Sequence, residues 1–483
     1  MVADDYAGRG VSMVGRVAEQ KKLAKVMSSN ESEFVAVYGR RRIGKTYLVR
    51  EFFKGKFLFQ HTGIEKGNFK RQLSGFRDSL VDCGYKGCPL PDDWTVAFRL
   101  LKELIERSRQ TRKVIFIDEM PWMDTPRSEF VSALEHFWNA WMSARKDVVL
   151  VVCGSATSWI INKVIRSRGG LHNRVTETIP LAPFTLAECE AYAVSRGLRL
   201  GRSELAELFM VFGGVAYYWR MLEKGKSVAQ NVDRLLFAKD GELRGEFDRV
   251  FASLFKNDEA YRRIVLALSG KQSMTRDELL GKLGDKEGGR WTHRLEELEQ
   301  CGFIRRYSGW GKKERESTYQ LTDNFSLFHL RFIRGESNPD EHYWQHSINS
   351  PRVNAWRGLS FERVCFWHIP QIKAALGVSG VLTQVYCWHH VADENYPAGA
   401  QIDMLIERAD HVINVCEMKF SLRPFSIEKA YLSQLKIKLG AFEQVSKTRS
   451  AIHLTLVTAA GLLRNKHSGI VQSEVTLDDL FRP

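Results

Sequence analysis

Residues 34–46, FVAVYGRRRIGKT, decide the fold of the first third of this chain. The apolar run 34–38 leads into a loop with glycines at its first and sixth positions, and a helical pattern, 45–53, follows. The loop consists of Gly39, Arg40, Arg41, Arg42, Ile43, Gly44, Lys45 and Thr46. Such glycines let backbone amides turn inward onto phosphates, and the start of a helix faces the same anion. We therefore predict an ATP site in which Lys45 reaches the terminal phosphates and the Thr46 hydroxyl binds Mg2+.

Two carboxylates follow a second apolar run. Residues 114–117 are apolar and end in Asp118-Glu119. We predict that Asp118 holds Mg2+ through water and that Glu119 polarises the attacking water, with an ordinary acidic turn as the alternative. A further strand, 57–60, is expected between the loop helix and this run. A glutamate beside the magnesium carboxylate usually accompanies that insertion, which favours a hydrolysing ATPase over a kinase of small nucleotides.

Two more polar residues are candidates for the same site. The apolar run 148–153 ends in Gly154-Ser155-Ala156-Thr157. We predict that Ser155 senses the γ-phosphate, although the serine could equally serve as a helix cap. Arg174 could approach the phosphate of its own or a neighbouring subunit, which leaves a homo-oligomer open, and the alternative is a solvated arginine.

The composition is that of an ordinary globular protein. The chain has 483 residues, enough for about three domains. No apolar run approaches the roughly 18 residues that span a bilayer, so we expect a cytoplasmic protein without a membrane partner. Eight scattered cysteines without a CxxC pair favour buried thiols over disulfides or zinc. The formal charge of +14 is compatible with a polyanionic partner such as DNA.

The order of patterns along the chain predicts an α/β fold in five parts. Strands and helices alternate first, which is typical of a parallel sheet covered on both faces. The parts are a P-loop core at 11–180, a helical lid at 181–250, a winged helix at 255–334, a linker at 335–355 and a separate α/β domain at 356–483, in which the expected order is helix, strand, strand, helix, strand.

The predicted winged helix has basic residues where a DNA backbone would lie. Its third helix, 289–301, carries Arg290, His293 and Arg294, and its wing carries Lys312, Lys313 and Arg315. Winged helices also serve as packing modules in related ATPases. The sequence is compatible with both a DNA-binding and a packing role.

The motifs together resemble the prokaryotic ATPase family first described from archaea, a branch related to AAA+ and STAND ATPases. The resemblance covers roughly residues 11–330. Its motifs are Met13-Val14-Gly15-Arg16 with Glu19, the phosphate loop, Ile115 to Glu119, Cys153-Gly154-Ser155, Leu181-Ala182-Pro183-Phe184 and Phe212 to Tyr218. Ala216 stands where the family commonly has proline, which affects turn rigidity more than chemistry. The resemblance implies ATP binding and hydrolysis, with a lid and a winged helix that respond to the nucleotide.

The C-terminal part carries a dispersed set of metal-ligand residues. Glu362 is expected on a helix that starts near Gly358, Asp403 on a strand, and Glu417 and Lys419 at the end of another strand. Alternate strand residues share a face, so Glu417 and Lys419 project together, and a neighbouring antiparallel strand could bring Asp403 beside them. Carboxylate oxygens suit Mg2+ or Mn2+, which activate water, while Lys419 would orient that water.

These four residues resemble the PD-(D/E)xK restriction-endonuclease fold over about residues 356–457. Gln401-Ile402 precedes Asp403 where the named motif has proline. The resemblance implies that Glu362, Asp403 and Glu417 bind metal and that Asp403, Glu417 and Lys419 act in DNA cleavage. Glu119 is the predicted catalytic residue of the separate ATP site. We expect ATP hydrolysis coupled to metal-dependent DNA cleavage. The alternative is a non-cleaving ATP-driven switch whose C-terminal domain only binds DNA or protein.

Overall fold

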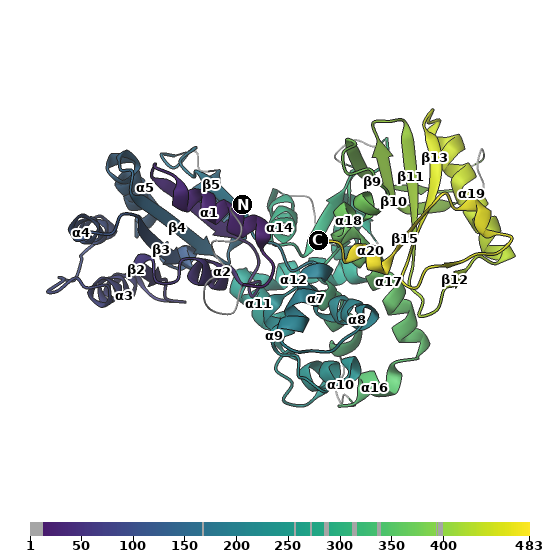
Figure 1. Cartoon of the computed structure of the whole chain (residues 1–483), viewed down its shortest axis with the longest axis horizontal. Coiled ribbons are helices and arrows are strands. Elements are labelled where there is room, and N and C mark those ends of the chain that lie inside the picture. Colours follow the sequence, from purple (N-terminus) through teal and green to yellow (C-terminus); the bar gives the residue numbers. More distant parts are fainter. Residues whose placement is uncertain are drawn as a thin grey trace. The chain divides into compact units, whose positions relative to one another are not determined.

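The computed structural model describes residues 13–166, 169–255, 257–270, 273–284, 289–311, 316–335, 340–392, 394 and 399–483. The chain forms two compact units, residues 1–183 and 184–483 (Figure 1). All eight cysteines lie among the described residues as free thiols; six are buried, and Cys83 and Cys387 are half-buried. Among the described helices, none has the length and apolar character that crossing a membrane requires.

The first unit contains the predicted parallel sheet, with strand order β2-β3-β4-β1-β5. Its strands are β1 (Glu33–Tyr38), β2 (Phe57–Thr62), β3 (Lys113–Asp118), β4 (Val148–Gly154) and β5 (Glu177–Pro180). The sequence patterns predicted the first four strands and missed the short β5. Because β4 lies between β1 and β3, the ends of these three strands meet at one edge of the sheet.

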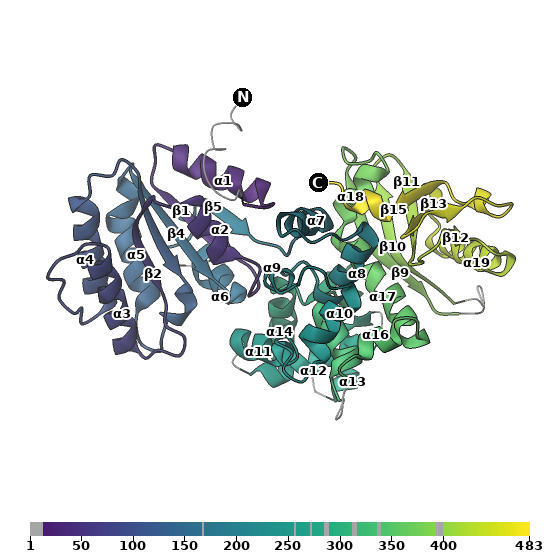
Figure 2. The ribbon, with the colours of Figure 1, turned by 60° about the horizontal axis from the view of Figure 1, so that its bottom comes forward.

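Helices cover both faces of this sheet (Figure 2). They are α1 (Val17–Ser28), α2 (Lys45–Phe52), α3 (Phe69–Asp82), α4 (Trp94–Arg107) and α5 (Phe130–Ala140). Phe34 and Ala36 of β1 pack with apolar residues of α3, α4 and α5, whereas Val35 and Val37 pack with those of α1 and α2. This alternation explains why the strands are apolar throughout, since a parallel sheet is buried on both faces.

The second unit begins with helices and a small sheet. Its first two helices are α7 (Leu186–Ser195) and α8 (Arg202–Phe212), which lie in the range predicted to be helical. After them come α9 (Ala216–Arg220), α10 (Val228–Val232), α11 (Glu246–Leu254), α12 (Asp258–Ser269), β6 (Met274–Thr275), α13 (Arg276–Leu283), α14 (Gly289–Gln300), β7 (Ile304–Tyr307), β8 (Thr318–Leu321) and α15 (Asn324–Phe328). The strands β6, β8 and β7 pair antiparallel in that order.

The C-terminal part contains a five-stranded mixed sheet, with order β15-β13-β11-β10-β9. Its elements are α17 (Pro351–Trp367), α18 (Ile369–Ala375), β9 (Thr383–His390), β10 (Ala400–Arg408), β11 (Val412–Lys419), α19 (Lys429–Ser446), β13 (Ala451–Thr458), β15 (Ser473–Thr476) and α20 (Leu477–Leu480). The first three strands are antiparallel, and β11, β13 and β15 run parallel. The predicted order of two strands between the helices was therefore wrong, because β9 precedes them. Helix α17 also begins before Gly358, since Ser350 caps it and Pro351 suits its first turn.

Part of the predicted linker, 335–355, is packed into the second unit. Residues 336–339 lie outside the described part, but the next residues form α16 (Tyr343–Ser347). The Trp344 side chain is fully buried, and the Asp233 carboxylate accepts hydrogen bonds from the backbone amides of Trp344 and Gln345 at 2.7 and 3.1 Å. One hydrophobic cluster runs from Phe184 to Phe481. The helices α7 to α12, the small sheet and the C-terminal sheet thus share a core.

A buried histidine joins the first helix of this unit to α17. His368 Nδ1 donates to the Val364 carbonyl at 2.7 Å, and its Nε2 accepts from the Leu186 amide at 2.9 Å. Acceptance at Nε2 requires the neutral ring, because a protonated imidazole has no acceptor nitrogen. Burial lowers the pKa of His368 to about 4, below the ordinary 6.5.

Because His368 is neutral in the folded chain, we predict that the stability of the second unit falls at acidic pH. Between pH 6.5 and 4 the unfolded chain binds a proton that the folded chain excludes, so stability falls as the pH falls. From pH 7 to pH 5, His368 should remove about 2 kcal/mol of unfolding free energy. Urea titrations at both pH values should show a smaller loss for His368→Gln than for the wild type. Equal losses would contradict this assignment.

Candidate functional site

The phosphate loop lies between β1 and α2, as predicted. Gly39 has a φ of 144° and Gly44 a φ of 96°, conformations that side chains disfavour. A Cβ at Gly39 would also overlap the Leu181 carbonyl oxygen. The Lys45 side chain is buried within the loop, where its ammonium donates to the carbonyls of Gly39 and Arg40 at 2.9 and 2.8 Å.

Arg16 holds the phosphate loop at Ile43, and we did not predict this role from the sequence. Its side chain is buried, and Nη2 donates to the Ile43 carbonyl at 3.2 Å. Glu19 lies 3.7 Å from Nη1 of the same guanidinium. The motif at residues 13–16, noted only for its resemblance to a family, thus holds the loop backbone in place.

The magnesium candidates Thr46 and Asp118 are in direct contact. The Thr46 hydroxyl donates to Asp118 Oδ2 at 2.9 Å, and the Glu119 amide donates to Asp118 Oδ1 at 3.0 Å. Asp118 is buried at the end of β3. Two hard oxygen groups therefore meet beside the loop lysine, which is a donor set that Mg2+ prefers.

Glu119 and Ser155 are joined across the sheet edge. The Ser155 hydroxyl and amide both donate to Glu119 Oε2, at 2.9 and 3.0 Å. Within the described residues, the other carboxylate oxygen accepts no hydrogen bond. Glu119 also has a φ of 45°, which turns the chain sharply after β3. Ser155 therefore holds the carboxylate that we predicted to be catalytic. The predicted role of Ser155 was contact with the γ-phosphate, and its contact with Glu119 was not predicted.

The structure does not join every predicted residue to this site. Arg41 and Arg42 are half-buried in the loop. Arg174 lies in the turn after Leu171 with an exposed side chain, and its guanidinium makes no hydrogen bond or ion pair in the part of the chain that the structure describes. Its approach to the phosphate of its own or a neighbouring subunit stays a prediction.

In the second unit, Glu417 and Lys419 project together, as the strand pattern predicted. Lys419 Nζ lies 3.0 Å from Glu417 Oε1. Two residues of α19 complete the group: Lys438 Nζ lies 2.6 Å from Glu417 Oε2, and the Tyr431 hydroxyl donates to Oε1 at 2.8 Å. Burial alone would raise the pKa of Glu417, but the two ammonium groups outweigh burial and lower it.

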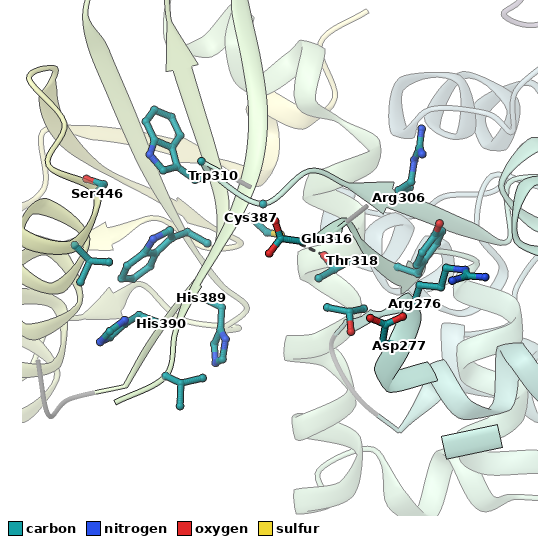
Figure 3. A pocket seen from close by; sticks show the side chains of 17 residues that line it. Arg276, Asp277, Arg306, Trp310, Glu316, Thr318, Cys387, His389, His390 and Ser446 are labelled. Carbon is teal, nitrogen blue, oxygen red and sulfur yellow. Dashed lines mark hydrogen bonds between the residues drawn. The ribbon is translucent and has the colours of Figure 1, made fainter. Parts of the chain in front are cut away.

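Asp403 has different surroundings. It lines a pocket of about 370 Å³ with Tyr307, Gln320 and Cys387. Figure 3 shows the adjoining pocket of about 1250 Å³, which shares Thr318 and Cys387 with the first; the Thr318 hydroxyl and the Cys387 thiol lie 3.3 Å apart. In the described ranges, no three His, Cys, Asp or Glu side chains are grouped so that they could hold a metal ion. Glu362, Asp403 and Glu417 are thus not brought together.

Helix α14 presents mixed charges. Arg290 and His293 are exposed, while Arg294 packs over the Trp291 ring, 5.1 Å from its centre. The following turns carry Glu296, Glu297 and Glu299. The predicted wing residues Lys312, Lys313 and Arg315 lie outside the described residues. Only the first turn of α14 therefore offers a basic surface.

Comparisons with known proteins find similarity to ATPases. Residues 13–191 match the family model of an ATPase domain predominantly from Archaea. An uncharacterized protein of Methanocaldococcus jannaschii is 25% identical over 389 residues, 79% of this chain and 82% of that protein. The solved Walker-type ATPase of Pyrococcus abyssi has a similar fold, with a TM-score of 0.50 and 16% identity over 66% of this chain and 96% of that chain. The ORC2 protein of Aeropyrum pernix gives a TM-score of 0.40 at 16% identity, over 67% and 95% of the two chains.

Residues 13–191 are therefore similar to an ATPase domain, and the Pyrococcus abyssi protein has a similar fold.

Proposed function

We propose that this protein is an ATP-hydrolysing switch that binds DNA through its second unit. The observation that carries the proposal is the continuous group of contacts from Lys45 in the loop through Thr46 and Asp118 to Glu119 and Ser155. These contacts join the phosphate-binding, magnesium-binding and water-activating groups at one edge of the sheet. Hydrolysis of ATP would therefore change the contacts of residues at the ends of both β3 and β4.

Each group has a defined role in this proposal. Lys45 binds the terminal phosphates, and the backbone amides of the loop surround them. Mg2+ would be held by the Thr46 hydroxyl and the Asp118 carboxylate, and it would stabilise the charge of the phosphates. Glu119 accepts the proton of the attacking water, and Ser155 is a positioning residue that holds its carboxylate.

DNA is the partner that the charge and the second unit favour. The chain has a formal charge of +14, and exchange of lysine and arginine for counterions drives binding to phosphates. The order α12, β6, α13, α14, β7, β8 supports the proposal of a winged helix. Arg290 and His293 at the start of α14 would contact the DNA backbone, with Glu297 lying 3.7 Å from His293 Nε2 on the same helix face.

Metal-dependent DNA cleavage is the second candidate. The chain order of Glu362, Asp403, Glu417 and Lys419 favours it, with Mg2+ or Mn2+ as the metal. Against it, both Glu417 oxygens are bound by protein groups, and Asp403 lines a separate pocket. Binding without cleavage is therefore the better supported function.

The proposal predicts a nucleotide-dependent affinity for DNA. A labelled duplex should bind the wild type about tenfold more tightly in one of the two states, ATP or ADP, because typical coupling between sites is of this size. Lys45→Ala should remove the difference, since it removes the phosphate-binding ammonium. Lys54→Ala, whose side chain is 78% exposed, is the matched control and should keep it. Equal wild-type affinities in ATP and ADP, or a difference that Lys45→Ala retains, would overturn the proposal.

A further inference from the structure

Glu417 is saturated by protein hydrogen-bond donors. Lys438 binds one carboxylate oxygen at 2.6 Å, and Lys419 and Tyr431 bind the other at 3.0 and 2.8 Å. The Glu417 side chain is only 11% exposed. A divalent cation takes its ligands from carboxylate oxygens, so a cation at Glu417 would have to displace an ammonium group. Glu417 therefore has no carboxylate oxygen available to a metal ion unless a protein group moves away.

The group nevertheless has a net positive charge and spare donors. Two ammonium groups surround one carboxylate, which leaves a charge of +1. Each ammonium carries three N–H donors, and within the described residues the carboxylate is the one hydrogen-bonding partner of each. Lys419 also lies over the Tyr431 ring, 5.0 Å from its centre. The Lys419 and Lys438 side chains are 32% and 23% exposed, so their remaining donors reach solvent.

Rigid elements position these two lysines, here called the lysine pair. Lys419 ends β11, which lies between β10 and β13 in the sheet. Tyr431 and Lys438 are seven residues apart on α19 and so share one helix face. The same helix is anchored by Leu435 and Phe442, which are buried in the core beneath it. The spacing of the ammonium groups is thus set by folding before any ligand arrives.

We infer that the lysine pair binds a phosphodiester of the DNA backbone without a metal ion, with Glu417 as its internal counter-ion. Lysine binds phosphate as a compact point charge, and a phosphate offers several oxygens to two converging ammonium groups. Glu417 limits the repulsion between the lysines, and Tyr431 orients its carboxylate. The inference rests on the proposed DNA binding, and it assigns to Glu417 and Lys419 a role other than cleavage.

The test measures DNA affinity in EDTA over a series of salt concentrations. Lys438→Gln and Lys419→Gln should each weaken binding of a labelled duplex by about tenfold, which is what losing a charge-assisted hydrogen bond costs. Each should also reduce the slope of log affinity against log salt by about 0.9. Lys436→Gln removes the same charge from an exposed position of α19 and should leave affinity unchanged. Circular dichroism confirms folding of each variant.

Three results would overturn the inference. Lys438→Gln and Lys419→Gln could bind DNA as tightly as Lys436→Gln, which would exclude the pair from the interface. Wild-type binding could vanish in EDTA and return with Mg2+ or Mn2+, together with nicking that Glu417→Ala loses; this would establish a metal site. A wild type that binds no DNA in any nucleotide state would overturn both the inference and the proposed function, whereas the first two results leave the proposed DNA binding intact.

Discussion

Replacing Glu119 with glutamine is expected to lower the rate of ATP hydrolysis by about two to three orders of magnitude, the usual contribution of a general base. Glutamine has nearly the same shape, and its amide oxygen can still accept the hydrogen bonds from the Ser155 hydroxyl and amide. It cannot accept the proton of the attacking water. Steady-state phosphate release measures the loss.

ATP binding should survive the same substitution. The groups that contact the phosphates and Mg2+ in the proposed site are Lys45, Thr46 and Asp118, and none of them changes. Calorimetric titration should therefore give an ATP affinity within about threefold of the wild type, less than one hydrogen bond contributes. Glu106→Gln, an exposed change on α4, is the charge-matched control and should hydrolyse ATP normally. Normal hydrolysis by Glu119→Gln would remove Glu119 from the mechanism, and joint loss of binding and hydrolysis would indicate a structural role.

The local geometry of the proposed ATP site could be predicted from sequence because its residues are neighbours along the chain. Gly39 to Thr46 form one strand-loop-helix segment, and Asp118 and Glu119 follow one strand. The partner of Ser155 could not be predicted in this way. It depends on β4 lying between β1 and β3, an arrangement that involves residues far apart in sequence.

The C-terminal residues show a different limit of sequence reasoning. Alternation along β11 correctly placed Glu417 and Lys419 together. Asp403 lies on β10, where the register with β9 shifts between Ile402 and Leu405. Such a bulge changes the direction of nearby side chains, and no residue pattern in this segment reveals it. The contact between Lys438 and Glu417 was not predicted. The two residues are far apart in sequence, and they meet only because α19 packs against the sheet.

The predicted linker failed for a related reason. Its composition is polar, and a single tryptophan does not make a hydrophobic pattern. In the structure the Trp344 ring lies 4.9 to 5.2 Å from the rings of Phe328, Phe332 and Trp356, measured between ring centres. These partners come from segments on both sides of the supposed linker. One aromatic residue therefore ties the two sides together.

Trp344→Ala should consequently destabilise the second unit by about 4 kcal/mol, the usual cost of deleting a large buried aromatic side chain. His346→Ala lies on the same short helix, and its side chain is 66% exposed, so it should change stability by less than about 0.5 kcal/mol. Urea unfolding followed by far-ultraviolet circular dichroism compares the two variants without relying on tryptophan fluorescence. If residues 340–355 acted only as a tether, both substitutions would have the same small effect. A large loss confined to Trp344→Ala would mean that the helices before this segment and the sheet after it unfold as one cooperative unit, because the cavity removes contacts from both.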